Sequence, residues 1–356
     1  MAGHATDPRR TRRPAGTPRT LPLMARRRGA GWSVVRAAAL AIVVLLGGCG
    51  SGGGAQVDRP AARTIGFLRA VFSGQADNQA AFLDELAKAG YVEGENLTLL
   101  GRDLAEVHAD RADAEATARG WQEQGADLIV ALSTTGAQAA AAAAPGVHVI
   151  FLVNDPVAGG LLTNPQRPEG RLTGATFRVP PDRTLDLARR ALPGVDVFGI
   201  VYPPADPAAL AVKDQAVKAA ADLGMSLVEA TFTGEQDAAA AVAAVRDRGA
   251  GAVWALNSPT TARFTKELET AAAARSLPLV ANTATSTALL TLRPDVPNLY
   301  RQMARQAVRL LGGTPVAEVP VENPGSFVTE INLQVAAALG VTVPEEVLAA
   351  AERVVR

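Results

Sequence analysis

The stretch DLIVALSTTGAQAAAAAAPGVHVIFLVNDP, residues 127–156, decides the fold class of this chain. Its first apolar run, Leu128–Leu132, is short and bounded by polar residues, which is typical of a buried strand in a parallel sheet. Ser133, Thr134 and Thr135 follow, and the alanines behind them favour a helix. We therefore place these hydroxyls at a helix N-terminus, where they can cap free N–H groups and where anions are attracted.

A second apolar strand, Val147–Val153, ends in Asn154-Asp155-Pro156. Ligands of open α/β sheets bind at the carboxyl ends of the strands, so Thr134, Thr135, Asn154 and Asp155 are predicted site residues. Each has a purely structural alternative. Ser and Thr are common helix caps, and Asp-Pro is a frequent turn.

The same alternation of strand and helix continues along the chain and then repeats. Strand residues recur at a similar spacing, pairing Ile65 with Val197, Leu128 with Val253 and Ile150 with Leu279. The sequence thus predicts an α/β protein with two similar, doubly wound parallel-sheet lobes and a ligand cleft between them. We assign 64–177 and 284–328 to the first lobe, and 178–283 and 329–356 to the second.

The second lobe offers its own candidate residues at the matching strand ends. Asn257 and Ser258 lie in a polar turn, and Asn282 follows a strand. Tyr202 is an aromatic side chain able to form a stacking wall. Asn164–Pro181 is interpreted as a loop, and Glu345–Val355 as a terminal helix that opens after Pro344.

Composition narrows the function class. The 356 residues include 35 basic and 35 acidic side chains, and this balance gives no support for nucleic-acid binding. Cys49 is the one cysteine and there are three histidines, so no metal site or cofactor is predicted. No G-x-S-x-G, H-E-x-x-H or P-loop pattern appears in the folded region, and we predict that the protein is not an enzyme.

The N-terminal residues have the layout of an export signal. Arg26–Arg28 precede an apolar run, Ala37–Leu46, and Leu46-Gly47-Gly48-Cys49 closes it in the manner of a bacterial lipobox. We expect 1–48 to be an N-terminal extension and lipoprotein signal peptide, and 49–63 to be a lipidated Cys49 with a flexible tether. Met24 would be a more ordinary start of such a signal than Met1.

Several pieces of the chain resemble a known family, the extracytoplasmic substrate-binding proteins of bacterial ABC importers, in the group that includes tryptophan and tyrosine binders. The matching pieces stand in the expected order: GYVEGENL at 90–97, DLIVA at 127–131, NDPVAG at 154–159, LTG at 172–174 and LGVTVPEE at 339–346. The resemblance implies a type I periplasmic-binding-protein fold.

The resemblance also implies roles for the site residues. Thr134 and Thr135 stand where the family holds an amino-acid carboxylate, and Asp155, next to Asn154, is a possible partner for an ammonium group. In the second lobe, Asn257 and Ser258 replace an Asp-Asn pair. Asn282 stands where an acidic residue often lies, so this lobe has lost acidic candidates.

The expected function is capture of a small polar ligand, an amino acid or related metabolite, for delivery to a membrane permease with its ATPase. The alternative is a ligand-sensing lipoprotein that regulates a membrane signalling partner, because the fold alone does not separate the two. In either case we expect an exported monomer, anchored by lipid on the outer face of the cytoplasmic membrane.

Overall fold

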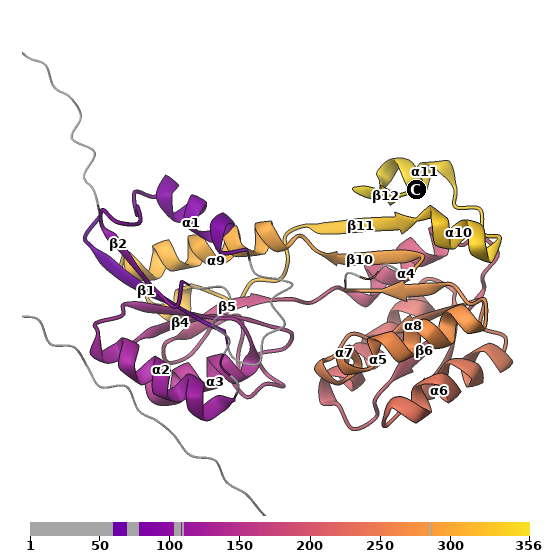
Figure 1. Cartoon of the computed structure of the whole chain (residues 1–356), viewed down its shortest axis with the longest axis horizontal. Coiled ribbons are helices and arrows are strands. Elements are labelled where there is room, and N and C mark those ends of the chain that lie inside the picture. The colour runs from indigo at the N-terminus through magenta and orange to yellow at the C-terminus, as the bar shows by residue number, and fades with distance from the viewer. Residues whose placement is uncertain (1–59, 70–77, 103–107, 109, 284, 286) are drawn as a thin grey trace, which may run out of the picture. The chain divides into compact units, whose positions relative to one another are not determined.

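The computed structural model describes residues 60–69, 78–102, 108, 110–283, 285 and 287–356. The predicted signal segment and Cys49 lie outside these residues. Within them, a five-stranded parallel sheet forms the first lobe (Figure 1). Its strands lie in the order β2 (Leu97–Leu100), β1 (Arg63–Leu68), β3 (Leu128–Ala131), β4 (His148–Val153) and β5 (Leu172–Thr176).

A seven-stranded sheet forms the second lobe and repeats this order before adding two strands. Its strands run β12 (Arg353–Val355), β11 (Phe327–Asn332), β10 (Leu290–Pro294), β9 (Leu279–Ala281), β8 (Ala252–Ala255), β6 (Val197–Tyr202) and β7 (Ser226–Thr231). The series β7-β6-β8-β9-β10 matches β2-β1-β3-β4-β5, and within the sheet only β11 pairs antiparallel, with β10. The prediction of two similar parallel-sheet lobes is confirmed.

Alternation along the strands explains why both faces of each sheet are covered. In β3, Leu128 and Val130 join a core cluster with α1 and α9, whereas Ile129 and Ala131 join a second cluster with α2 and α3. A strand that is apolar at every position needs such cover on both sides. The first-lobe helices are α1 (Gln79–Lys88), α2 (Arg111–Glu123), α3 (Thr134–Ala143) and α9 (Val296–Leu311), with a short 3-10 helix at Val316–Glu318.

The second lobe is covered in the same manner. Helices α4 and α5 share one core cluster with Phe198 and Ile200, and α6 and α8 share the other with Val201 and Val253. The helices are α4 (Pro181–Ala191), α5 (Pro207–Asp222), α6 (Glu235–Asp247), α7 (Pro259–Arg263), α8 (Thr265–Ala274), α10 (Leu333–Leu339) and α11 (Glu345–Ala350).

Each lobe has a glycine at the same place in its sheet. Gly66 in β1 pairs with Ile129, and Gly199 in β6 pairs with Val253. A Cβ at Gly66 would lie 2.4 Å from the Trp121 ring, and one at Gly199 would lie 2.7 Å from Val245. Both glycines therefore allow a helix, α2 or α6, to pack closely on the central strands.

The chain passes between the two sheets three times. It leaves the first lobe after β5, returns after β10 into α9, and crosses again into β11. The latter two crossings are joined, because the backbone N–H of Asp295 donates to Ser326 O at 3.0 Å and the Ser326 hydroxyl donates to Asp295 Oδ2 at 3.2 Å. Both sheets belong to one compact unit of the chain.

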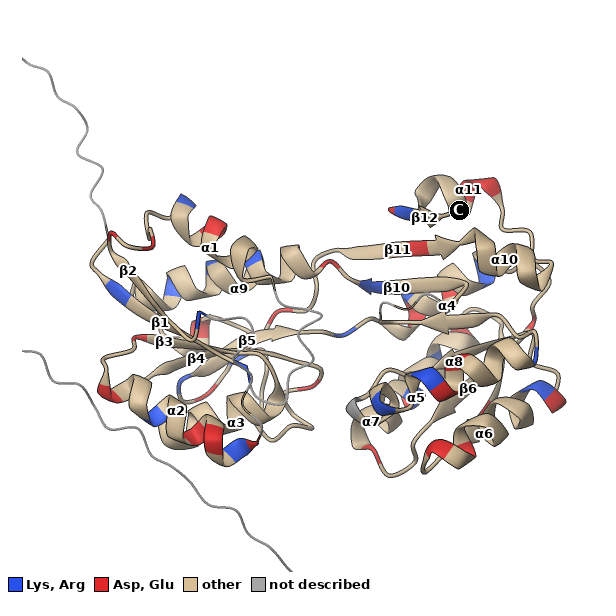
Figure 2. Ribbon diagram, viewed as in Figure 1, with Lys and Arg blue, Asp and Glu red and all other residues tan. Residues whose placement is uncertain are grey.

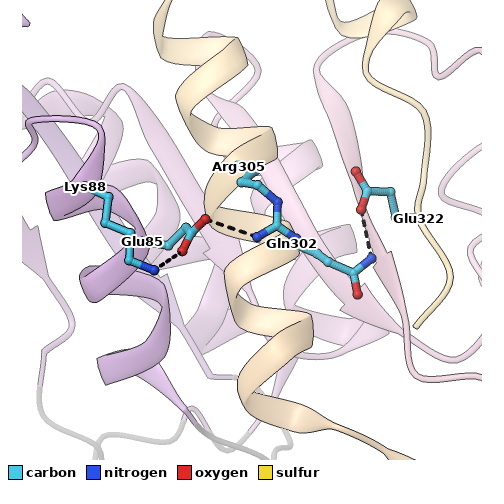
Figure 3. A network of polar contacts seen from close by, with 5 residues as sticks. All are labelled: Glu85, Lys88, Gln302, Arg305 and Glu322. Carbon is cyan, nitrogen blue, oxygen red and sulfur yellow. Dashed lines mark hydrogen bonds and ion pairs between the residues drawn. The ribbon is translucent and has the colours of Figure 1, made fainter. Parts of the chain in front are cut away.

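Helix α9 is held on the first lobe by polar contacts as well as by its apolar face (Figure 3). Glu85 of α1 accepts hydrogen bonds from Lys88 at 2.8 Å and from Arg305 of α9 at 3.1 Å. The bond from Lys88, and then that from Arg305, lower the pKa of Glu85. On the other side of α9, Gln302 donates to Glu322 at 2.8 Å.

The sequence interpretation differs from the structure in three places. Residues 290–294, assigned above to the first lobe with 284–328, form β10 and pair with β9 and β11 of the second sheet. The stretch interpreted as a loop, Asn164–Pro181, contains β5, whose Gly174 weakens the strand signal. The terminal helix ends at Ala350, and the chain then pairs as β12 with β11, because the β-branched pair Val354-Val355 favours a strand.

Candidate functional site

A cavity lies at the carboxyl ends of strands from both sheets. The first lobe contributes Asn154 and Asp155, which follow β4. The connection from β5 to α4 contributes Phe177, Arg178 and Val179. The second lobe contributes Ala208, Ala211 and Val212 of α5, together with Asn257 after β8 and Asn282 after β9. Four of the predicted site residues are therefore brought together here.

Asp155 is fixed in the cavity wall by its own turn. Its Oδ1 accepts hydrogen bonds from the backbone N–H groups of Val157 at 2.9 Å and Ala158 at 3.0 Å. Among the described residues, no hydrogen bond engages Oδ2. The half-buried carboxylate is thus oriented through one oxygen, while the other has no hydrogen bond to a described residue.

Asn154 and Asn282 occupy equivalent places, directly after β4 and β9, but differ in what their amides do. Asn282 is 3% exposed; its Nδ2 donates to Thr184 Oγ1 and Leu292 O, and its Oδ1 accepts from Trp254 Nε1. Both donors of Asn282 are committed to holding the second lobe together. The amide of Asn154 makes no hydrogen bond to a described residue and lines the cavity.

Thr134 and Thr135 begin helix α3, and Ser133 is the residue that caps it. The Ser133 hydroxyl accepts from the N–H of Gly136 at 2.9 Å. A Cβ at Gly159 would come within 2.8 Å of Thr134 Cγ2, so the start of α3 packs against the turn that carries Asp155. Thr134 and Thr135 are not among the residues lining the cavity.

Ser258 is a buried cap of α7 rather than a cavity residue. Its hydroxyl accepts from Thr261 N–H at 3.1 Å, and the side chain is 1% exposed. The first lobe reaches its cap, Ser133, two residues after β3, whereas the second lobe inserts Asn257 before Ser258. The additional residue, Asn257, is half-buried and is the polar residue of this turn that lines the cavity.

Asp206 joins two loops of the second lobe and has a structural function that the sequence interpretation missed. Oδ1 caps α5 through Ala208 N–H at 2.9 Å, and Oδ2 accepts from Thr260 N–H at 3.2 Å. Burial acts to raise the pKa of Asp206, but hydrogen bonds from the side chains of Thr260 and Ser258 and from the two backbone N–H groups outweigh it and lower the pKa. The carboxylate therefore holds the two loops together, and Asp206 is not among the residues that line the cavity.

Tyr202 is not brought to the cavity. It is 7% exposed, lies in the core beneath α5, and donates its hydroxyl to Glu229 Oε2 of β7 at 2.8 Å. Burial, and then the hydrogen bond to Glu229, raise the pKa of the phenol. The aromatic side chain that lines the cavity is Phe177, which follows β5 in the region interpreted as a loop.

The remaining polar groups do not form another type of site. No cluster of three or more His, Cys, Asp or Glu able to hold a metal occurs among the described residues. In the same part of the chain, every helix is too short or too polar to cross a membrane. Figure 2 shows acidic and basic residues interspersed on the helices of both lobes, in keeping with the balanced charge.

Comparison with known proteins identifies the family of this chain. The family model described as ABC transporter substrate binding protein matches residues 73–355. The chain belongs to this family. Its members bind ligands and are not catalysts, so the prediction that the protein is not an enzyme is confirmed.

Individual relatives agree with this family. A tyrosine-binding protein of Clostridioides difficile strain R20291 is 28% identical over 169 residues, which are 45% of this chain and 48% of that protein. The match thus spans about half the length of this curated relative.

Two solved structures share the fold. A conserved domain protein from Vibrio cholerae is 27% identical with a TM-score of 0.66, covering 83% of this chain and all of that one. An ABC domain in complex with L-Trp from Streptococcus pneumoniae is 22% identical with a TM-score of 0.67 over the same shares. The predicted family and the type I periplasmic-binding-protein fold are confirmed.

Proposed function

We propose that this substrate-binding protein captures an amino acid in the cavity between its two lobes and delivers it to a membrane permease with its ATPase. The observation that carries the proposal is Asp155, which lines the cavity and whose Oδ2 makes no hydrogen bond to a described residue. A carboxylate held in this way suits an ammonium group, because charge-assisted hydrogen bonds are the stronger ones.

Aromatic amino acids are the first ligands to test. The Streptococcus structure holds L-Trp, and the Clostridioides relative is named for tyrosine. Phe177 supports this choice, since an aromatic side chain in the wall can stack on an aromatic ligand. The small apolar residues Ala208 and Ala211 also line the cavity and carry no charge.

Isothermal titration of the mature protein with each standard L-amino acid tests the binding function. We expect one or a few amino acids to bind with a stoichiometry of one. Absence of binding to all of them, with no amino acid carried through purification by native mass spectrometry, would contradict the proposal.

Transport is tested separately in cells. Deletion of the gene is expected to reduce uptake of the labelled amino acid that the purified protein binds. Normal uptake by the deletion strain, together with intact binding in vitro, would instead favour the sensing lipoprotein.

The proposed location is the outer face of the cytoplasmic membrane, where the protein acts as a lipid-anchored monomer. The lipobox ending in Cys49 supports this. Replacement C49A is expected to leave the precursor unprocessed and without lipid, as measured by intact mass and membrane fractionation. A Cys49→Ala protein that carries the same lipid mass as wild type would exclude this anchor.

A further inference from the structure

The connection between β5 and α4 places a cation in the cavity wall. Phe177 extends the pairing of β5 by donating its N–H to Val153 O at 2.8 Å, so it belongs to the first lobe. Val179 is 6% exposed and packs in a core cluster of the second lobe. Arg178 stands between these two anchors and lines the cavity. Its backbone position is therefore fixed from both sides.

The Arg178 guanidinium has no hydrogen bond or ion pair with any described residue. The neighbouring Arg183 differs, because its guanidinium lies 5.0 Å from the centroid of the Phe327 ring. Arg178 is half-buried, and a guanidinium partly removed from water without an anion is costly. A ligand carboxylate that accepts its paired N–H groups would offset that cost.

The charges of the cavity lining complete the argument. Asp155 is the anion of the lining, Arg178 is its cation, and the other polar residues are the amides of Asn154, Asn257 and Asn282. The α5 wall is made of Ala208, Ala211 and Val212, which carry no charge. The lining thus matches a ligand with one ammonium, one carboxylate and an uncharged remainder.

We propose that Arg178 is a specificity-determining residue that binds the carboxylate of a zwitterionic ligand, while Asp155 binds its ammonium group. This assignment rests on the proposed amino-acid-binding function. It departs from the role implied by resemblance, in which Thr134 and Thr135 hold the carboxylate, because neither threonine lines the cavity. The ligand class is the α-amino acids with neutral side chains.

Titration calorimetry of Arg178→Gln and Arg178→Lys tests the proposal. Each amino acid is compared with the amine that lacks its carboxylate. The first pairs are L-tyrosine with tyramine and L-tryptophan with tryptamine, and the other standard L-amino acids follow in the same way. Arg178→Gln is expected to weaken the bound amino acid at least about tenfold and to leave its amine unchanged, since only the amino acid has the carboxylate. Arg178→Lys keeps the charge but loses the paired geometry, so it should weaken the amino acid less.

The exposed Arg171 supplies the matched control, because Arg171→Gln makes the same change of charge outside the cavity lining. It is expected to bind as wild type does. Melting temperatures of all variants report whether they fold. Equal binding of the amino acid by wild type and Arg178→Gln overturns the assignment and leaves the proposed function standing. A parallel loss of amino acid and amine overturns it as well. A wild-type protein that binds no amino acid overturns both.

Discussion

The two lobes share a strand order and differ in how they use the polar residues at their strand ends. After β4, Asn154 and Asp155 keep an amide and a carboxylate oxygen available to the cavity. After β9, the equivalent Asn282 is buried and tied to Trp254 and to two other partners. Asp206 likewise joins two loops of the second lobe. The same fold therefore leaves polar atoms without a described partner at the cavity on one side, and uses the equivalent atoms as internal supports on the other.

This difference explains why, among the described residues, the second lobe contributes no charged side chain to the cavity lining. Its carboxylate at the strand edge is already satisfied by N–H groups, and its wall on the cavity consists of small apolar residues from α5 together with two amides. This wall therefore offers a small apolar surface and amide groups instead of charge. Charge comes from the first lobe and from the connection between the lobes.

The largest expected effect compares the two asparagines. Asn282→Ala leaves Trp254 Nε1 and the Leu292 carbonyl buried without their partner, which should lower the free energy of unfolding by about 2–4 kcal/mol. Asn154→Ala is the matched change and should cost about 0.5 kcal/mol or less, because its amide has no such bond. Urea denaturation measures both. Equal losses would show that the two positions are not used differently.

Next in size is the effect of Asp155 on binding. Asp155→Asn keeps an oxygen that can accept from Val157 and Ala158, so the turn should persist. Loss of the charge should weaken binding of an amino acid by about 1.5–3 kcal/mol, which calorimetry measures. Asp222→Asn, in an exposed pair with Lys218, is the control. Unchanged affinity in Asp155→Asn would remove this carboxylate from the site.

Asp206 should affect stability rather than ligand charge. In Asp206→Asn the amide NH₂ replaces the oxygen that accepts from the Thr260 N–H, so two donors face each other. This should lower the free energy of unfolding by about 1 kcal/mol at neutral pH. Because the folded state lowers the pKa of Asp206, its contribution is present above the usual carboxyl pKa and is lost as pH falls through the lowered value. The stability gap between wild type and variant should therefore close in acid. A gap that stays constant from pH 7 down to about pH 2 would argue against this linkage.

The smallest expected effect is at the α1–α9 contact. Glu85→Gln removes the charge that Lys88 and Arg305 share, and such partly exposed pairs contribute about 0.5 kcal/mol. The pKa of Glu85 is lowered, so this contribution also disappears as pH falls below the normal carboxyl range. Thermal melts at low and at high salt measure it. A loss that salt does not reduce would point to packing instead of charge.

Much of the fold follows from local pattern, and much of the site does not. Strands such as Leu128–Ala131 were predictable because they are apolar at every position, and the repeat of the pattern predicted the second lobe. β5 and β10 were missed or misplaced, because short strands with Gly or Pro carry little signal. Recognition of β5 would have extended the strand-end rule to Phe177 and Arg178.

The site residues divide for a physical reason. A polar residue after a strand marks an edge of the sheet, and Asn154, Asp155 and Asn257 do line the cavity. Whether its atoms face a ligand depends on tertiary partners. Trp254 and Thr184 engage Asn282, and Glu229 engages Tyr202, through contacts that the local sequence does not specify. Ser258 differs, because its partner Thr261 lies in the helix that it caps.

A crystal structure of the protein with its bound amino acid tests the central claim most directly. We predict that the ligand ammonium lies within hydrogen-bond distance of Asp155 Oδ2, and that Asn282 keeps its bonds to Trp254 and Thr184. A ligand held by Asn282, Ser258 or Asp206 with no contact to Asp155 would contradict the division of function between the lobes.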